Sequence, residues 1–159
     1  MSHLFATWRM DYVAAPKHEG CIFCSFPAEE RDEERYIVYR GVECFVILNV
    51  YPYNPGHMMV APYRHTNLYE TLTSDEHVEI GRLTAEAIRT IGRAMRPDGF
   101  NIGMNLGKTA GAGIVDHLHL HIVPRWNGDN NFMPIVADTR VIPEALSATY
   151  RKLKECWGA

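Results

Sequence analysis

The sequence has neither an excess of basic residues nor a long apolar run. Its 159 residues carry 16 Lys and Arg against 19 Asp and Glu, a formal net charge of −3, and its isoelectric point is about 6.2. Nucleic-acid-binding domains usually show a basic face or an isoelectric point above roughly 9, so we expect no nucleic-acid partner. No stretch of about 18 apolar residues occurs, so we expect no membrane-spanning helix and no membrane partner.

Cysteine is also scarce, and its four copies are unevenly spaced at Cys21, Cys24, Cys44 and Cys156. Small secreted domains that depend on disulfides carry denser and more regular cysteine frameworks. The first ten residues lack a basic segment followed by an apolar one, so we expect no signal peptide. These absences predict a reduced, cytoplasmic protein. The length fits one domain over residues 1–159, with an N-terminal arm at 1–20 and a C-terminal extension at 126–159 that contains a helix.

Short apolar segments bounded by turn residues predict most of the fold. Strand-like segments occur at 36–39, 44–48, 57–61, 100–106 and 117–124, whereas the charged stretch 29–35 is expected to be an exposed loop. Thr73 with Glu76 three residues later fits a capping box, and apolar residues then recur at helical spacing as far as Met95. A final helix is expected after Pro143. The pattern predicts an α+β domain, an antiparallel β-sheet of about five strands with a long central helix and a C-terminal helix on one side.

Three histidines alternate with apolar residues at His117, His119 and His121. A period of two places all three on one face of a strand. A half-buried strand that carries polar side chains outward would explain one histidine better than three in register. Imidazole binds metals, moves protons near neutral pH and acts as a nucleophile toward phosphorus or carbonyl centres. The residues alone leave these three roles open.

Two further motifs carry chemistry. Cys21-x-x-Cys24 offers two metal ligands or a redox pair, and a redox pair would require a helix N-terminus after a strand, of which the sequence gives little sign. Zinc would need two more ligands, and His65 and one histidine of the triplet are available. The loop 107–113 is rich in glycine but lacks the Gly-Lys-Ser/Thr ending of a phosphate-binding loop. It is either a flexible connection or a set of backbone N–H groups that face an anion.

The His-x-His-x-His segment, preceded by Ala-Gly-Ala-Gly and followed by Pro124-Arg125, resembles the histidine triad (HIT) family. Other parts of the resemblance occur in the family's order, namely Cys21-Ile-Phe-Cys24, Leu48-Asn49, Pro55-Gly56-His57, Pro62-Tyr-Arg-His65 and Asn105. The resemblance covers about residues 20 to 125, which implies a catalytic core at 21–125. Within the family, four segments are similar to the bacterial diadenosine tetraphosphate phosphorylase branch, namely 8–12, 49–57, 99–107 and 124–132.

The resemblance implies a role for each matching residue. His119 corresponds to the nucleophile that forms a nucleotidyl-histidine intermediate, and His121 and His57 correspond to histidines that line the phosphate site. Asn105 corresponds to a phosphate-site asparagine and Asn49 to the residue that holds the ribose hydroxyls. An apolar clamp on the base is implied at Ile22, Phe23, Ile47 and Val50. Members of the family that carry metal hold a structural zinc with residues that correspond to Cys21, Cys24, His65 and His117.

The same resemblance implies cleavage of a phosphoanhydride bond in an adenine dinucleotide such as diadenosine tetraphosphate, a homodimer and no organic cofactor. Alternatives are a hydrolase of nucleoside phosphoramidates or other conjugates, a nucleotide-binding regulatory protein, and a zinc hydrolase whose histidine triplet binds the catalytic metal. The sequence departs from the family at Gly113, where a glutamine that contacts the transferred phosphate is usual. The vacated space is expected to be filled by backbone N–H groups or by inorganic phosphate as a second substrate.

Overall fold

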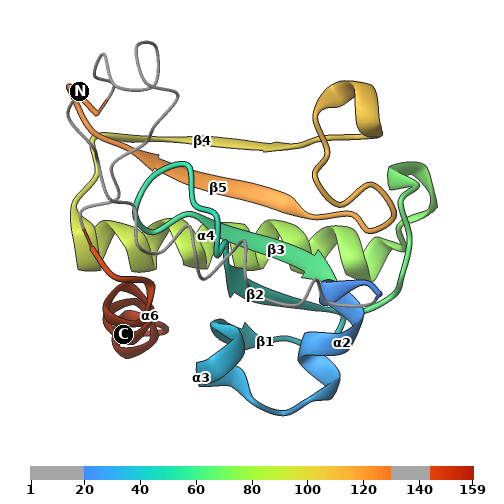
Figure 1. Ribbon diagram of the computed structural model, residues 1–159, viewed down its shortest axis with the longest axis horizontal. Coiled ribbons are helices and arrows are strands. Elements are labelled where there is room, and N and C mark those ends of the chain that lie inside the picture. The colour runs from blue at the N-terminus through green and yellow to red at the C-terminus, as the bar shows by residue number, and fades with distance from the viewer. Residues whose placement is uncertain (1–19, 130–143) are drawn as a thin grey trace, which may run out of the picture.

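The structure is a computed structural model that describes residues 20–129 and 144–159 (Figure 1). Five antiparallel strands form one sheet in the order β1-β2-β3-β5-β4. Their bounds are β1 Ile37–Arg40, β2 Cys44–Leu48, β3 Met58–Pro62, β4 Gly99–Met104 and β5 Leu120–Arg125. The predicted α+β class and the five-stranded antiparallel sheet are therefore confirmed. None of the helices in these two ranges is long and apolar enough to cross a membrane.

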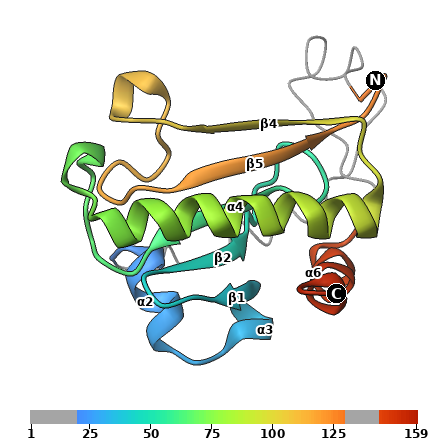
Figure 2. The ribbon, with the colours of Figure 1, turned by 180° about the vertical axis from the view of Figure 1, so that it is seen from behind.

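The long helix α4, Ser74–Met95, lies across one face of the sheet, as Figure 2 shows from behind. It begins with the predicted capping box, in which the backbone N–H of Glu76 donates to Thr73 Oγ1 and the backbone N–H of Thr73 donates to Glu76 Oε2. It ends where Arg96 adopts a left-handed conformation with φ of 49°, directly before Pro97. Its apolar stripe packs on β2, β3 and β5.

Strand β2 is buried on both of its faces. Cys44, Val46 and Leu48 point into the cluster that α4 covers. Phe45 and Ile47 point to the opposite face, into a second cluster, here named the hook cluster, whose buried members are Phe23, Ile37, Phe45, Ile47, Met59 and Ala61. Because Phe23 belongs to helix α2, Ile22–Ala28, helices cover both faces of the sheet at this end. The expectation of helices on one side only was therefore wrong.

One local expectation near the N-terminal end was also wrong. The charged stretch 29–35 contains a short helix, α3, Asp32–Arg35, rather than only loop. The guanidinium of Arg40 anchors it by donating to both carboxylate oxygens of Asp32 and to the carbonyl oxygen of Pro27. Cys21 occupies the N-cap position of α2, so a helix begins at the Cys-x-x-Cys motif, but among the described residues no strand precedes it, as a redox pair would require.

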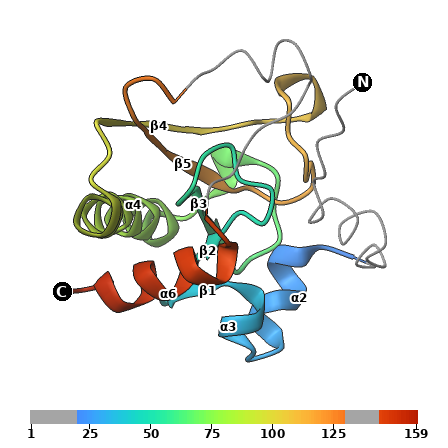
Figure 3. The same cartoon turned by 60° about the vertical axis from the view of Figure 1, so that its left-hand side comes forward.

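The predicted C-terminal helix is present as α6, Leu146–Cys156, beside α4 and β1 (Figure 3). The Tyr150 hydroxyl donates to the carbonyl oxygen of Ile37, and the Trp157 ring stacks on Tyr39 with 5.1 Å between ring centroids. These contacts close the end of the sheet away from the histidines. Pro143 and residues 1–19 of the expected arm lie outside the described residues.

Candidate active site and metal cluster

The three histidines of the triplet share one face, as the alternation predicts, although β5 begins only at Leu120. Leu118 and Ile122 are buried in the cluster under α4. His121 pairs with Met59 of β3 in the sheet register, and Met59 belongs to the hook cluster on the opposite face. The strand therefore begins three residues later than expected and ends one residue later, but its two-sided pattern is correct.

His119 is held in one tautomer by the backbone. Its Nδ1 lies 2.8 Å from the carbonyl oxygen of His117, which can only accept, so Nδ1 carries the proton and donates it. The other ring nitrogen, Nε2, then carries the lone pair. The ring of Phe23 packs on the imidazole of His119 with 4.8 Å between centroids, which fixes the plane of the ring. His119 thus presents an oriented, neutral nitrogen donor.

His57 and His121 form a directed pair. The backbone N–H of Tyr53 donates to Nδ1 of His57 at 3.1 Å, so the neutral His57 ring carries its proton on Nε2. That proton is donated to Nδ1 of His121, 2.9 Å away. A neutral His121 must then carry its own proton on Nε2. The pair therefore ends in an N–H donor on the same face as His119, whose ring centroid lies 4.8 Å from that of His121.

All three rings are neutral at physiological pH. Burial, together with the neighbouring His121 and His119, lowers the pKa of His57 to about 3. Burial and the neighbouring His119 lower the pKa of His121 to about 4. Burial also lowers the pKa of His119, although its bond to the carbonyl of His117 opposes the shift. The cluster offers a neutral nucleophile and a neutral donor rather than a group of cations.

The two asparagines implied by the resemblance lie on either side of this pair. Asn49 places its Nδ2 3.4 Å from Nδ1 of His57 and accepts from the backbone N–H of Tyr51. Asn105 donates to the carbonyl oxygen of Gly111 at 3.4 Å. It also lines, together with His121, the cavity described below. Both asparagines are therefore next to the histidine cluster.

The four residues of the implied base clamp are not equivalent. Phe23 and Ile47 are buried in the hook cluster, with 0% and 2% of their surfaces exposed. Ile22 is half-buried and packs against that cluster, and Val50 is half-buried in the turn after β2. Ile22 and Val50 therefore offer apolar surface to a ligand, whereas Phe23 packs on His117 and His119 and Ile47 lies inside the hook cluster.

A cavity of about 320 Å³ lies on the other side of His121, over β4 and β5. Amide side chains and one guanidinium supply most of its polar groups, and its lining comprises Tyr53, Asn54, Asn101, Ile102, Gly103, Met104, Asn105, His121, Val123 and Arg125. Arg125 is fixed there by a two-pronged bond to Asp129 and by donation from Nη1 to Asn101 Oδ1. Across this face of the sheet, the hook cluster is therefore followed by the histidines and then by this polar cavity.

The glycine-rich loop contains a short turn of 3₁₀ helix at Lys108–Ala110. The backbone N–H groups of Gly111 and Ala112 are bonded within the loop, to the carbonyl oxygens of Lys108 and Gly107. These two groups are thus already satisfied and do not serve the expected anion-binding role. Gly113 is exposed, and a Cβ built on it would meet no atom within 4 Å. The space beside Gly113 is therefore open among the described residues.

Four residues that are far apart in sequence bring sulfur and nitrogen donors together. The ligand atoms of Cys21, Cys24, His65 and His117 all lie within 4.8 Å of one another. Nδ1 of His117 is 3.3 Å from Cys21 Sγ and 3.6 Å from Cys24 Sγ, and Nδ1 of His65 is 3.3 Å from Cys24 Sγ. Two ligands about 2.3 and 2.0 Å from a tetrahedral zinc are about 3.5 Å apart, so the donor set fits zinc.

The protonation of the donors fits the same metal. Nε2 of His117 donates to the carbonyl oxygen of Pro62 at 2.8 Å, which leaves Nδ1 unprotonated and aimed at the thiols. Partial burial and the neighbouring Cys21 thiol raise the pKa of Cys24, because two thiolates at this distance repel without a cation between them. Within the described residues, this is the group that gathers three or more metal-ligand side chains. His119 and His121 do not belong to this group, so the triplet itself does not form such a cluster among the described residues.

Sequence reasoning gave no role to Tyr53, Pro62 or Arg64. Tyr53 fixes the tautomer of His57 through its backbone and packs its ring on His57 and His121. Pro62 acts through its carbonyl oxygen, and a backbone acceptor leaves no residue-type signal. The position of Tyr53, four residues before His57 in a loop with two prolines, was the one available signal.

Comparisons with known proteins agree with this geometry. The HIT domain matches residues 30–128, a range that contains every histidine of both clusters. The chain is 43% identical to the AP-4-A phosphorylase of Mycobacterium tuberculosis (strain ATCC 25618 / H37Rv), over 99% of this chain and 85% of that protein. It is 34% identical to an uncharacterised HIT-like protein of Saccharolobus solfataricus, over 71% of this chain and 79% of that protein.

Solved structures show the same fold. A hypothetical histidine triad nucleotide-binding protein from Sulfolobus tokodaii superposes with a TM-score of 0.70 at 30% identity, over 86% of this chain and 91% of that chain. A zinc-bound histidine triad family protein from Mycobacterium smegmatis also gives a TM-score of 0.70, at 27% identity, over 86% of this chain and 92% of that chain. Zinc is therefore present in at least one protein that shares this fold.

Proposed function

The chain belongs to the HIT domain family, and we propose that it is an enzyme that cleaves a phosphoanhydride bond of dinucleoside polyphosphates such as diadenosine tetraphosphate. The observation that carries the proposal is the state of His119, which is neutral, has its Nδ1 proton bonded to the carbonyl of His117, and has its lone pair on Nε2. The near full-length similarity to a protein named AP-4-A phosphorylase supports this choice of substrate.

In the first step, Nε2 of His119 attacks the α-phosphorus, and an N–P bond forms while the bridging P–O bond breaks. The electron pair of that bond leaves on the oxygen of the departing nucleoside polyphosphate. The imidazole becomes cationic, and its Nδ1–H bond to the carbonyl oxygen of His117 stabilises that charge. His121 donates its Nε2 proton toward the phosphate oxygens, with His57 behind it to hold the tautomer.

In the second step, an acceptor oxygen attacks the phosphorus and the N–P bond breaks. Its electron pair returns to Nε2 of His119, which becomes neutral again, and the proton of the acceptor leaves to solvent. Water as acceptor gives a nucleoside monophosphate, and inorganic phosphate gives a nucleoside diphosphate. The open space at Gly113 supports phosphate as acceptor, because the amide that family members place there is missing and nothing described fills its position. This open space, together with the similarity to a protein named AP-4-A phosphorylase, is the basis for proposing phosphorolysis.

The two halves of the substrate occupy opposite sides of the histidines in this proposal. The transferred nucleotide lies toward Ile22, Asn49 and Val50, where apolar surface and an amide are available. The departing half extends into the polar cavity beyond His121, whose amides and Arg125 suit a polyphosphate. Adenine as the preferred base is proposed from the relative alone.

We propose that Cys21, Cys24, His65 and His117 hold a structural zinc. Bound there, the metal would neutralise the two thiolates and fix α2 against residues 117–121, here named the histidine segment. Four protein donors would hold the ion, which is the closed ligand set of a structural rather than a hydrolytic zinc. His117 thereby connects the metal cluster, through its own carbonyl oxygen, to His119.

A homodimer is proposed from the edge of the sheet. Strand β4 is an edge strand of the described sheet, and Ile102 on β4 and the nearby Leu106 have 47% and 50% of their surfaces exposed. An exposed edge with apolar side chains pairs readily with a second copy. Light scattering of the purified protein measures the assembly.

The test of the proposed function is product analysis with and without phosphate. Diadenosine tetraphosphate is incubated with the zinc-loaded enzyme, and the nucleotides are separated by chromatography. ADP plus ATP that appear only with phosphate support phosphorolysis, whereas AMP plus ATP regardless of phosphate exclude it and leave hydrolysis. His119→Ala is expected to abolish turnover and the trapping of labelled nucleotide while its circular dichroism stays unchanged. Wild-type turnover in that variant would exclude the covalent step.

A further inference from the structure

The segment 62–66, here named the exit segment because it leaves β3, contacts the histidine segment at three points. The carbonyl oxygen of Pro62 accepts from Nε2 of His117 at 2.8 Å, and the carbonyl oxygen of Thr66 accepts from the backbone N–H of Leu118 at 2.7 Å. His65 of the same segment places its ring edge-on to His117, with 5.2 Å between centroids. The path of the exit segment therefore decides where the nitrogen donors of His65 and His117 lie.

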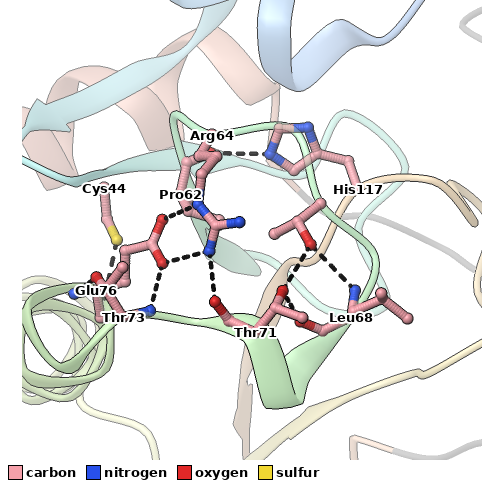
Figure 4. Close-up of polar contacts among 9 residues, drawn as sticks. Cys44, Pro62, Arg64, Leu68, Thr71, Thr73, Glu76 and His117 are labelled. Carbon is pink, nitrogen blue, oxygen red and sulfur yellow. Dashed lines mark hydrogen bonds and ion pairs between the residues drawn. The ribbon is translucent and has the colours of Figure 1, made fainter.

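An ion pair holds the exit segment to the start of α4 (Figure 4). Arg64 donates from Nε to Glu76 Oε1 at 2.9 Å and from Nη2 to Glu76 Oε2 at 2.7 Å. The same Nη2 donates to the carbonyl oxygen of Thr71, in the connection between the exit segment and the helix. Figure 4 shows the Arg64 guanidinium between these acceptors, with the bond from His117 to Pro62 on the other side of the segment.

Glu76 is the buried member of the ion pair: only 2% of its side chain is exposed, whereas 44% of the Arg64 side chain is exposed. Glu76 also receives the backbone N–H of Thr73, so its carboxylate closes the capping box and faces the exit segment at once. The bond from Arg64 lowers the pKa of Glu76 to about 2, which keeps the carboxylate ionised. A buried carboxylate of this kind requires a cation of fixed geometry, and the planar fork of arginine supplies it.

We propose that Arg64 and Glu76 are positioning residues that hold the exit segment and thereby aim the His65 and His117 donors at the metal cluster. The same bonds set the histidine segment, so the pair also orients His119 through the carbonyl oxygen of His117. The kinetic part rests on the proposed function, whereas the metal-binding part does not. Neither residue belongs to the donor set of the metal cluster or to the histidines proposed to act on the substrate.

A second ion pair on the same helix provides a matched control. Arg82 donates to Glu79 at 2.7 Å, and the side chains are 59% and 8% exposed, which resembles the Arg64–Glu76 pair. Glu79 instead accepts from the backbone N–H groups of Glu43 and Cys44, before and at the start of β2. If ion pairs matter only for general stability, Arg64→Gln and Arg82→Gln should behave alike.

The first experiment measures zinc release from the full-length, zinc-loaded protein to a chromophoric chelator, far below the melting temperature. Arg64→Gln is expected to release zinc roughly tenfold faster than wild type, the lower end of the range seen when hydrogen-bond partners behind metal ligands are lost. Arg82→Gln is expected to stay within about twofold of wild type, and Arg64→Lys, which keeps the charge but loses the fork, should fall between. Unchanged release in Arg64→Gln, or equal acceleration in Arg82→Gln, overturns the proposal.

The second experiment needs neither metal nor activity. Nitrogen-15 spectra of the imidazoles in metal-free wild type are expected to show His117 protonated on Nε2 and His119 on Nδ1. Arg64→Gln should shift both toward the averaged signal of an unrestrained imidazole, while Arg82→Gln should not. Glu76→Gln, which keeps an acceptor for Thr73, replaces Arg64→Gln if the latter does not fold. Wild-type imidazole signals in these variants overturn the proposal even if the enzyme proves inactive on dinucleotides.

The third readout separates positioning from substrate binding. In the zinc-loaded state, Arg64→Gln is expected to lower kcat for diadenosine tetraphosphate about tenfold with KM within about twofold, because the nucleophile is misdirected and the binding surface is intact. A raised KM at wild-type kcat contradicts a positioning role. If wild type does not cleave the dinucleotide, the proposed function fails, and the zinc-release and imidazole results still decide the inference.

Discussion

Nε2 of His57 donates to Nδ1 of His121 across 2.9 Å, and the backbone N–H of Tyr53 fixes the direction of that bond. Both imidazoles are neutral, since burial lowers the pKa of His57 to about 3 and that of His121 to about 4. The fold therefore does not place a pair of cationic histidines at the proposed phosphate position. The site delivers one directed N–H donor, and it does so without a charge that would have to be buried.

The neutral pair makes the folded protein sensitive to acid. In the unfolded chain His57 binds a proton near pH 6.5, but in the folded protein it does so only near pH 3. Between these values the unfolded state holds more protons, so the free energy of unfolding falls as the pH falls from about 6.5 toward 4. From pH 7 to pH 5, wild type is expected to lose about 2 kcal/mol more than His57→Asn in urea denaturation. Any pH dependence of the zinc cluster is common to both proteins and cancels in the difference between their losses. Equal losses in the two proteins would exclude this linkage.

The metal cluster predicts a specific role for the N-cap of α2. Cys21→Ser removes one of the four donors, so zinc content by elemental analysis should fall well below one equivalent per chain, and the melting temperature should drop. Cys156→Ser is the control, because Cys156 lies in α6 and is not part of the cluster. Unchanged zinc in Cys21→Ser, or the same loss in Cys156→Ser, would remove the proposed site.

Some elements of the structure could be predicted from the sequence and others could not. The capping box of Thr73 and Glu76 and the apolar strand at 44–48 are local patterns, and both appear in the structure as expected. The four metal donors were implied by resemblance, and the structure does bring them together. Their separation in the sequence, from Cys21 to His117, could not predict the distances between them. Helix α2 was missed because it is short and carries an internal proline, Pro27, which weakens any helical signal.

The second function of Glu76 could not be read from sequence. Its place three residues after Thr73 explained it fully as a cap, so nothing called for a further partner. Its bond to Arg64 depends on how the connection between β3 and α4 folds back, which is a property of the tertiary structure. The sequence also does not indicate the roles of the carbonyl oxygens of Pro62 and His117, because every residue has a carbonyl oxygen.

The departure at Gly113 predicts which acceptor the enzyme uses. Gly113 has no positive φ and a Cβ there meets no atom, so Gly113→Gln should fold without strain. The added amide is expected to occupy the proposed phosphate position and raise the ratio of AMP to ADP among the products by roughly tenfold at fixed phosphate. Gly113→Ala fills less of the space and carries no amide, so it should stay near wild type. An unchanged ratio in Gly113→Gln would place the phosphate elsewhere.

The polar cavity beyond His121 predicts a defect that depends on the leaving group. Asn101 lines the cavity and accepts from Nη1 of Arg125, so Asn101→Asp adds a negative charge where the departing polyphosphate is placed. The KM for diadenosine tetraphosphate should rise at least about tenfold at low salt, because like charges in a partly enclosed site repel. Adenosine 5′-phosphoramidate, whose leaving group is only ammonia, should be cleaved by the variant with wild-type kcat/KM. Equal losses on both substrates would mean that Asn101 acts on the transferred nucleotide, and wild-type kinetics on both would mean that the departing half takes another path.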